Sequence, residues 1–198
     1  MANWTITSHF IYGDVEKVKK VYDQLKMLYD EKFEGKKHPE ASKNWIGHLM
    51  EMNNIEEPKG VYGRSFVNWV DEYSNEGFWF DTEDAWGPAE LLSDIFHKIH
   101  TEDKPLYHCY ECIEEGCEVY VYHNEGEQDI YPSSPYYADS SKGCDYFDDV
   151  ASAIRYYNEL FDKNVSEELS YDDFRKYLNE NELDDREFFT FNKFVEDE

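Results

Sequence analysis

Positive charge is scarce in this sequence, and the scarcity is confined to one part of it. The 198 residues hold 19 Lys and Arg against 45 Asp and Glu, which gives a formal net charge of −26. Residues 1–64 hold ten residues of each sign, so the excess lies after Arg64, where 9 basic residues face 35 acidic ones. Because phosphate contacts need Lys and Arg, direct nucleic-acid binding by this region is disfavoured. A basic partner is favoured, and a generically solvated surface is the alternative.

Cysteines and long apolar runs are also few. Four cysteines spread unevenly over 198 residues do not make a disulfide framework. The first residues lack the basic stretch and apolar core of a signal peptide, and no apolar run reaches membrane-spanning length. We therefore expect a soluble, reduced, cytoplasmic protein with no membrane partner.

Aromatic residues, by contrast, are abundant. They make up 18% of the chain, with 17 tyrosines, which is too apolar for wholesale disorder despite the charge. A chain of 198 residues has room for one good core plus an appendage, or for two small domains.

The clearest fold signal lies in residues 75–122. Phe78 to Phe80 is a short aromatic run typical of a strand. Pro88 suits the first turn of a helix that we expect to reach His100. This helix carries one apolar stripe at helical spacing, formed by Leu91, Leu92, Ile95, Phe96 and Ile99. Two further strands are expected at residues 106–110 and 117–122.

Earlier elements complete an α+β pattern. Residues 4–12 predict a strand, and we expect Asp14 to cap a helix that ends at Gly35. A short helix at 44–52 and a strand at 65–73 follow, before a hairpin turn at 74–77. Residues 1–125 therefore predict a ferredoxin-like domain, an antiparallel sheet with helices packed on one face.

The remaining residues predict a loop, two helices and a C-terminal segment. Residues 126–145 are rich in turn formers and read as an irregular loop. Helices are expected from Asp145 to Lys163 and from Ser170 to about Asn179, and Phe188 to Val195 either forms a last strand or docks. The third region, residues 146–198, is therefore expected to be a helical C-terminal extension.

Three features together resemble a known family. They are the opening Met1-Ala2-Asn3-Trp4 before a strand, Trp86-Gly87-Pro88 at the second helix, and the Tyr110-Glu111 … Glu114-Glu115-Gly116 turn. They resemble a family of small ferredoxin-like proteins of unknown function encoded by bacteriophages, plasmids and other mobile elements. The likeness covers about residues 1–125 and implies the fold and a mobile-element source, but no catalytic residue. We expect Trp86 to be buried as a wedge between helix and sheet.

Two segments invite a metal. Cys109, Cys112 and Cys117, flanked by His108 and His123, are zinc-ligand residue types, but a strand places Cys109 and Cys112 on opposite faces. Residues 162–173 resemble a calcium loop from Asp162 to Asp173. Glu167 stands where that loop needs glycine, and Asp173 stands where it needs the longer glutamate. We expect neither zinc nor calcium and no cofactor, with Ser170 as a helix N-cap.

No catalytic motif stands out, since nucleophile elbow, phosphate loop, dinucleotide fingerprint and zinc-protease motif are all missing from the sequence. Trp69, Trp79 and Tyr120 have the rings to stack on bases, but neighbouring carboxylates favour core packing instead.

We therefore expect a non-enzymatic acidic binding protein that occupies a basic, nucleic-acid-binding surface on another protein. An inhibitor of host defence, of anti-CRISPR or anti-restriction type and acting in the host cytoplasm, would work in this way. The alternatives are a metal-binding regulator using the Cys109, Cys112 and Cys117 cluster, or an enzyme with an unrecognised site. The candidate contact residues are Glu111, Glu114, Glu115, Glu118, Asp145, Asp148, Asp149, Asp172, Asp173, Asp184 and Asp185.

Overall fold

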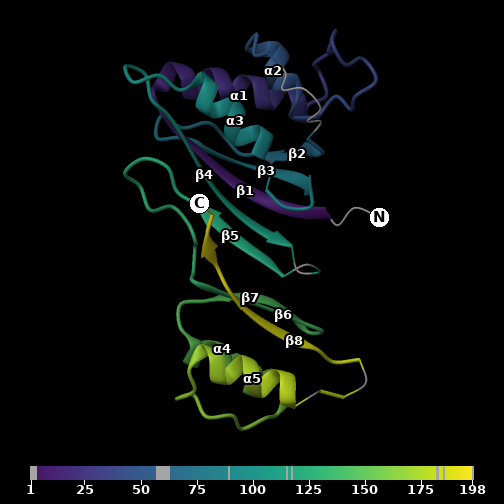
Figure 1. Ribbon diagram of the computed structural model, residues 1–198, viewed down its shortest axis with the longest axis vertical. Coiled ribbons are helices and arrows are strands. Elements are labelled where there is room, and N and C mark those ends of the chain that lie inside the picture. Colours follow the sequence, from purple (N-terminus) through teal and green to yellow (C-terminus); the bar gives the residue numbers. More distant parts are fainter. Residues whose placement is uncertain are drawn as a thin grey trace. The chain divides into compact units, whose positions relative to one another are not determined.

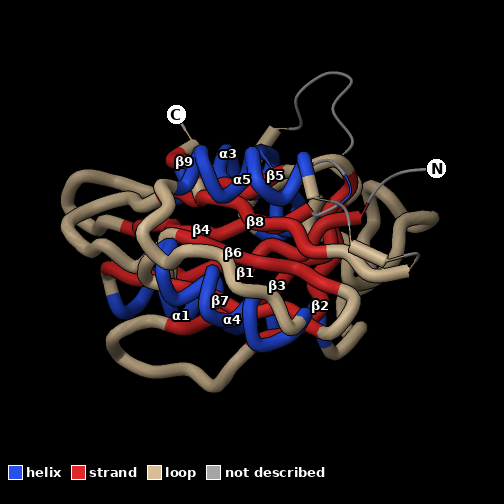
Figure 2. Tube along the Cα trace, turned by 90° about the horizontal axis from the view of Figure 1, so that it is seen from below, coloured by secondary structure: helices blue, strands red, loops and turns tan. Residues whose placement is uncertain are grey.

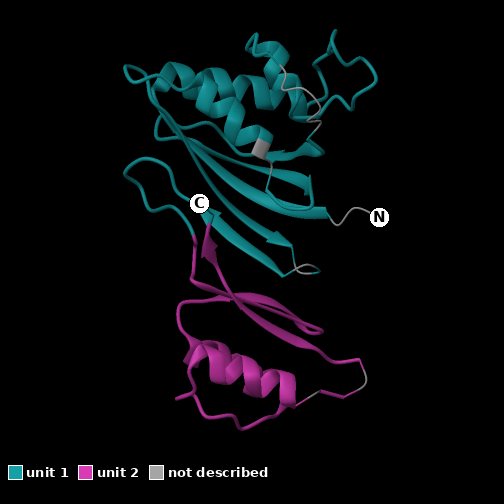
Figure 3. Cartoon of the chain, viewed as in Figure 1, with its two compact units in different colours: residues 1–131, 197–198 teal, residues 132–196 magenta. Residues whose placement is uncertain are grey.

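The computed structural model divides the chain into two compact α+β units (Figure 3). Unit 1 comprises residues 1–131 and 197–198, and unit 2 comprises residues 132–196. The described residues are 4–56, 63–88, 90–114, 116, 118–181, 183–184 and 186–197. Within them there are five helices and two β-sheets.

Unit 1 is built on an antiparallel sheet in which the strands run in the order β2-β3-β1-β4-β5 (Figures 1 and 2). Its strands are β1 (Trp4–Gly13), β2 (Ser65–Val70), β3 (Phe78–Ala85), β4 (Leu106–Glu114) and β5 (Val119–His123). Its helices are α1 (Val15–Tyr29), α2 (His48–Met52) and α3 (Glu90–Ile99).

All three helices cover the same face of this sheet (Figure 1). Alternation along the strands directs Ile11, Phe78 and Phe80 to that face. There they meet the apolar stripes of α1 and α3 in one buried cluster, because an apolar face must be removed from water. The stripe expected on α3 is confirmed by the burial of Leu91, Leu92, Ile95 and Phe96.

The opposite face of the sheet carries a smaller aromatic cluster. Phe10, Tyr12 and Cys109 point there and are covered by Tyr131. The Asn124 side chain holds this covering segment, since its amide nitrogen donates to the Tyr131 carbonyl at 2.6 Å and its oxygen accepts the Tyr131 N–H at 2.9 Å. Unit 1 is therefore closed by its own chain on part of this face.

Helix α1 starts where the sequence predicts but ends earlier. The Asp14 side chain accepts the Lys17 N–H at 3.1 Å, which confirms the N-cap. The prediction that Gly35 ends the helix is wrong. The helix ends at Tyr29, and Glu31 takes the left-handed conformation (φ 54°) that a glycine usually supplies.

Unit 2 contains a second antiparallel sheet, in the order β7-β6-β8. Its elements are β6 (Tyr136–Ser140), β7 (Gly143–Phe147), α4 (Val150–Phe161), α5 (Tyr171–Glu180) and β8 (Phe189–Lys193). The helical C-terminal extension expected at 146–198 is therefore not what the structure shows, although the last strand considered at Phe188 to Val195 is present as β8. The irregular loop expected at 126–145 is wrong, because part of that segment forms a hairpin. After β9 (Val195–Glu196), the chain returns to unit 1 at Asp197.

Local chemistry explains the hairpin. The Ser140 hydroxyl donates to the Gly143 carbonyl at 2.6 Å, and Gly143 has a φ of +130°, which only glycine adopts without strain. The core of unit 2 then forms where α4 and α5 meet β8, with Tyr157, Phe174 and Phe191 almost fully buried.

Candidate functional site

The structure exposes most of the acidic residues proposed from the sequence. Glu111 and Glu114 are corrections, because their side chains are only 5% and 7% exposed. Both lie on β4, which runs between β1 and β5, so they cannot form a solvated acidic row. Glu115 and Asp185 lie outside the described residues. The exposed members are Glu118, Asp145, Asp148, Asp149, Asp172, Asp173 and Asp184.

Some exposed members already have structural roles. Asp149 caps α4 by accepting the Ser152 N–H at 2.7 Å, and this contact lowers its pKa. Asp173 accepts the Ser170 hydroxyl at 2.6 Å while Ser170 caps α5, which confirms the predicted N-cap. Asp172 and Asp184 make no such contact with any described side chain, so their charges are available to a partner.

Unit 1 adds exposed acids that the sequence analysis did not select. Glu72 and Glu76 lie at the turn between β2 and β3, and Glu83 lies on β3. No ion pair joins any of the three to a cation within the described ranges. Their shared position in residues 65–131, where 17 acidic residues face two basic ones, was the available signal.

Cys109 and Cys112, the two described cysteines of the predicted cluster, do not share a site. Cys109 pairs with Phe10 and Cys112 with Thr7 in the β1–β4 register, so the two thiols lie on opposite faces as predicted. Burial raises the pKa of both, that of Cys112 to about 11, which keeps them as thiols at neutral pH. Cys117 lies outside the described residues.

The segment resembling a calcium loop is used for helix ends. Asp162 closes α4 in a left-handed conformation (φ 50°), and Ser170 begins α5. The part of the chain that the structure describes contains no group of three His, Cys, Asp or Glu residues arranged to hold a metal ion.

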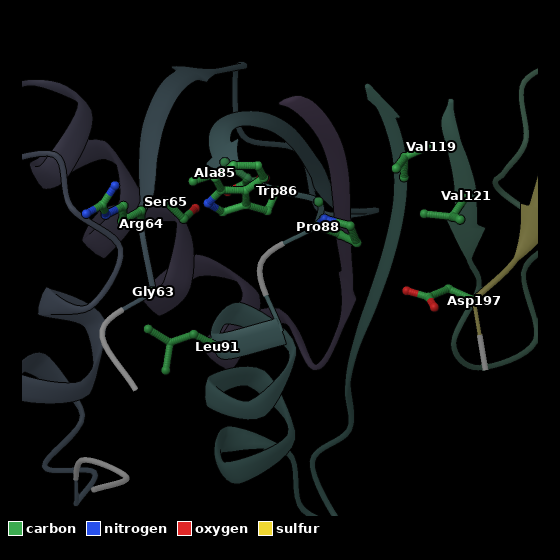
Figure 4. Close-up of a pocket in the computed structure, with 12 residues that line it drawn as sticks. Gly63, Arg64, Ser65, Ala85, Trp86, Pro88, Leu91, Val119, Val121 and Asp197 are labelled. Atoms are coloured by element: carbon green, nitrogen blue, oxygen red, sulfur yellow. The ribbon is translucent and has the colours of Figure 1, made fainter. Parts of the chain in front are cut away.

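A cavity of unit 1 lies where β3 leads into α3 (Figure 4). We call it the Trp86 pocket. Its volume is about 460 Å³, within the range of about 300–1,000 Å³ common for ligand sites. Its lining residues are Gly63, Arg64, Ser65, Asp84, Ala85, Trp86, Gly87, Pro88, Leu91, Val119, Val121 and Asp197.

Trp86 is not the buried wedge expected from the sequence. Its side chain is 63% exposed, and its backbone is left-handed (φ 77°), a conformation that is uncommon and strained for a bulky residue. The prediction failed because Gly87, at φ +140°, lets the chain turn the indole outward before α3 begins.

Two polar side chains in the Trp86 pocket have unused hydrogen-bonding capacity. Asp84 and Ser65 are register partners on β3 and β2, and each is only 1% exposed. Oδ2 of Asp84 accepts the hydroxyls of Thr7 at 2.5 Å and Thr82 at 2.7 Å. Oδ1 of Asp84 and Oγ of Ser65 have no hydrogen-bond partner among the described residues.

Burial governs the ionisation of this carboxyl group. Burial raises the pKa of Asp84, and the nearby hydroxyls of Ser65, Thr7 and Thr82 oppose the rise. Ser65 is close enough to Asp84 to stabilise its charge, yet the geometry leaves both free oxygens without a formed hydrogen bond. A donor in the Trp86 pocket would satisfy both.

A buried hydrogen-bond chain leads away from Asp84 beneath the helices. Thr82 gives its single hydroxyl proton to Asp84, so its oxygen accepts Nε2–H of His9 at 2.8 Å. Nδ1 of His9 must then accept Nε2–H of His108 at 2.9 Å. Ser93 lies beyond, with its hydroxyl 3.4 Å from Nδ1 of His108. The network thus assigns one tautomer to each histidine.

Both histidines are neutral. Burial, reinforced by its neighbour His108, lowers the pKa of His9 well below its usual value. Burial and then His123 lower the pKa of His108 to about 3. The layout of Ser93, His108 and His9 resembles a nucleophile, a base and an orienting group. A base with a pKa near 3, however, takes a proton poorly at neutral pH.

Among the described residues, no helix combines the length and apolar character needed to cross a membrane. No family model, curated protein or solved structure matches this chain.

Proposed function

We propose that this chain is a non-enzymatic acidic binding protein that occupies a basic, nucleic-acid-binding surface of another protein. One observation carries the proposal: exposed carboxylates greatly outnumber the cations available to neutralise them. Unit 1 has 29 acidic and 12 basic residues, and unit 2 has 16 and 7, so the net charges are −17 and −9. Both units therefore contribute to the acidic surface in proportion to their size.

Several of the few cations already form ion pairs. Lys104, one of two basic residues in 65–131, pairs at 2.5 Å with Glu16 of the neutral N-terminal region. Within the described residues of unit 2, Lys142 pairs with Glu187, Arg155 with Glu167 and Lys176 with Glu180, which leaves Asp172 and Asp184 without a counterion. Carboxylates without a counterion raise the local negative potential and attract a basic partner. They also repel nucleic acid itself.

We also propose that unit 1 is ferredoxin-like and that the protein comes from a mobile element. The strand order β2-β3-β1-β4, with α1 after β1 and α3 after β3, supports the ferredoxin-like arrangement expected from the sequence. The family resemblance supports a mobile-element source. An acidic protein from such a source suits an inhibitor of host defence, of anti-CRISPR or anti-restriction type, that takes the place of nucleic acid on a host protein.

Two observations weaken the alternative functions. The low pKa of His108 weakens the arrangement of Ser93, His108 and His9, which resembles a nucleophile, its base and an orienting group. Cys109 and Cys112 lie on opposite sheet faces, which weakens the metal-regulator alternative.

Competition with DNA tests this function. Guide-RNA nuclease complexes and restriction nucleases are incubated with labelled DNA and increasing amounts of the protein, at about 50 and 200 mM salt. We expect displacement of DNA from at least one of these nucleases, weaker at the higher salt because exposed charges are screened. Binding that leaves DNA in place, or that is indifferent to salt, contradicts the mimicry.

A further inference from the structure

The charges that line the Trp86 pocket favour a positively charged ligand. Two of its carboxylates, Asp84 and Asp197, face a cavity that contains one basic residue. That residue is Arg64, whose side chain extends away from Trp86 and Pro88 in Figure 4. The unmatched carboxylates exclude a phosphate or another anion as the guest, because a buried negative charge repels it.

The second carboxylate is held in place within unit 1. The Tyr110 hydroxyl donates to Oδ2 of Asp197, and the Asp197 N–H donates to the Tyr122 carbonyl at 2.7 Å. Asp84 and Asp197 both lie close enough to Cys112 to raise the pKa of its thiol, although burial is the larger cause. The two carboxylates therefore act on one region of unit 1.

The free acceptors have the geometry of a fork. Ser65 and Asp84 stand directly opposite each other on neighbouring antiparallel strands, where Cβ atoms are about 4.5–5.5 Å apart. Ser65 Oγ and Asp84 Oδ1 are thus adjacent, buried and unpartnered within the described structure. A planar guanidinium carries five N–H donors and can serve both, whereas an ammonium is a single point charge.

The walls suit an arginine side chain. Leu91 supplies apolar surface for its methylene stem, and Val119 and Val121 line the far side of the same cavity (Figure 4). The exposed Trp86 indole provides a face on which a guanidinium can stack. The left-handed backbone of Trp86 keeps this ring out of the core, a strain that a purely structural tryptophan does not need.

We propose that the Trp86 pocket binds the guanidinium group of an arginine side chain presented by the basic partner. The identity of the partner rests on the proposed function, but the guanidinium chemistry rests on the pocket alone. Asp84 forms the charged hydrogen bond, Ser65 accepts a second donor, and Trp86 covers the guanidinium plane. An exposed arginine would thereby anchor the acidic protein at one point of its partner.

The test uses a small probe in place of a partner. N-acetylarginine methylamide, its lysine counterpart and its citrulline counterpart are titrated into the full chain. The methyl resonances of Leu91, Val119 and Val121 are followed by NMR. We expect saturable shifts with the arginine compound, weaker ones with lysine, and none with uncharged citrulline. Equal shifts with arginine and citrulline overturn the proposal.

Paired variants locate the effect. Asp84→Asn removes the buried charge and should weaken binding at least about tenfold. Asp81→Asn makes the same change in net charge on β3 and should leave binding unchanged, because Asp81 pairs with Ser8 on the other face. If Asp84→Asn fails to fold, Trp86→Ala at an exposed position takes its place and should weaken binding. Wild-type affinity for the arginine probe in a folded Asp84→Asn or Trp86→Ala variant overturns the proposal.

The result is separable from that of DNA competition. Arginine binding without displacement of DNA would support the arginine pocket and contradict the proposed nucleic-acid mimicry. Displacement of DNA without any response to the arginine probe would contradict the arginine pocket but not the proposed function.

Discussion

Units 1 and 2 are equally acidic for their size, but their interiors differ in kind. All seven histidines and all five tryptophans of the chain lie in unit 1, and unit 2 has none of either. Unit 1 buries His9, His108 and Asp84 in one hydrogen-bonded chain. The core of unit 2 is formed mainly by stacked and edge-on phenylalanine and tyrosine rings, with Tyr157 and Phe174 at its centre.

This difference indicates that buried and exposed acidic residues have different roles in the two units. A buried polar chain is expensive to desolvate, and apolar residues of similar volume would stabilise a sheet at least as well. Its presence beside the Trp86 pocket is consistent with a site for a specific guest. The acids of unit 2 lie on the surface and at helix starts, where they cost little and add to the field that attracts a basic partner.

The largest expected effect comes from breaking the aromatic core of unit 2. Phe174 is fully buried and contacts Tyr157, Phe189 and Phe191. Phe174→Ala should lower the free energy of unfolding of unit 2 by about 3–5 kcal/mol. Tryptophan emission reports unit 1 only, so urea unfolding followed by emission and by far-UV circular dichroism distinguishes the units. We expect the emission midpoint to stay in place, and an equal shift of both signals would show that the units unfold together.

A pH titration should affect the units differently. The folded pKa values of His9 and His108 lie below the unfolded value of 6.5, so the unfolded chain binds more protons as the pH falls below 6.5. The stability that this pair gives to unit 1 is therefore complete above pH 6.5. It is lost on acidification, by up to about 1.4 kcal/mol per pH unit for each histidine. Ser93, Asp94, His97, His123 and Glu125 line a cavity beside His108. His9 lies against Thr82, Phe80 and Tyr110 of the sheet.

The measurement is urea unfolding of unit 1 by tryptophan emission between pH 7.5 and 4.5. His108→Gln should show a shallower fall than wild type, because one titrating group is gone. His38→Gln is a matched control at a histidine outside this chain of hydrogen bonds and should keep the wild-type slope. Identical slopes for all three proteins would refute the assignment.

A smaller effect is expected at the start of α5. Ser170→Ala removes the hydroxyl that accepts the Asp173 N–H and should destabilise unit 2 by about 1 kcal/mol. Ser141→Ala, at an exposed hairpin position, should change stability by less than about 0.5 kcal/mol. Thermal melting of the two variants side by side checks the cap, and similar melting temperatures would argue against it.

The smallest effect is expected at Trp86. Because the indole is exposed, Trp86→Ala should change the free energy of unfolding by no more than about 0.5 kcal/mol. A loss of several kcal/mol in chemical denaturation would restore the buried wedge that the sequence suggested.

The sequence predicted what depends on local pattern. The caps at Asp14 and Ser170, the apolar stripe of α3 and the opposed faces of Cys109 and Cys112 follow from spacing alone. The hairpin of unit 2 was not predicted, because β6 is only five residues long and lies just after Pro135. Its pairing with β8 also joins segments that are distant in the sequence.

The candidate site was harder to predict. Glu111 and Glu114 were chosen for charge, yet their position in β4 buries them. Asp84 was one acid among 45 until the register placed it opposite Ser65. The polar chain from Asp84 to His108 joins residues up to 99 positions apart, and only the strand pairing brings them together.

The most direct measurement compares three variants of identical net charge in the DNA competition assay. Asp172→Lys/Asp184→Lys and Glu72→Lys/Glu76→Lys reverse exposed acids of unit 2 and unit 1. Asp23→Lys/Glu34→Lys makes the same change in the neutral N-terminal region. We expect at least one of the first two to weaken displacement of DNA, mainly through slower association, while the third behaves like wild type. Equal behaviour of all three variants would show that net charge alone is responsible and would contradict a defined acidic binding surface.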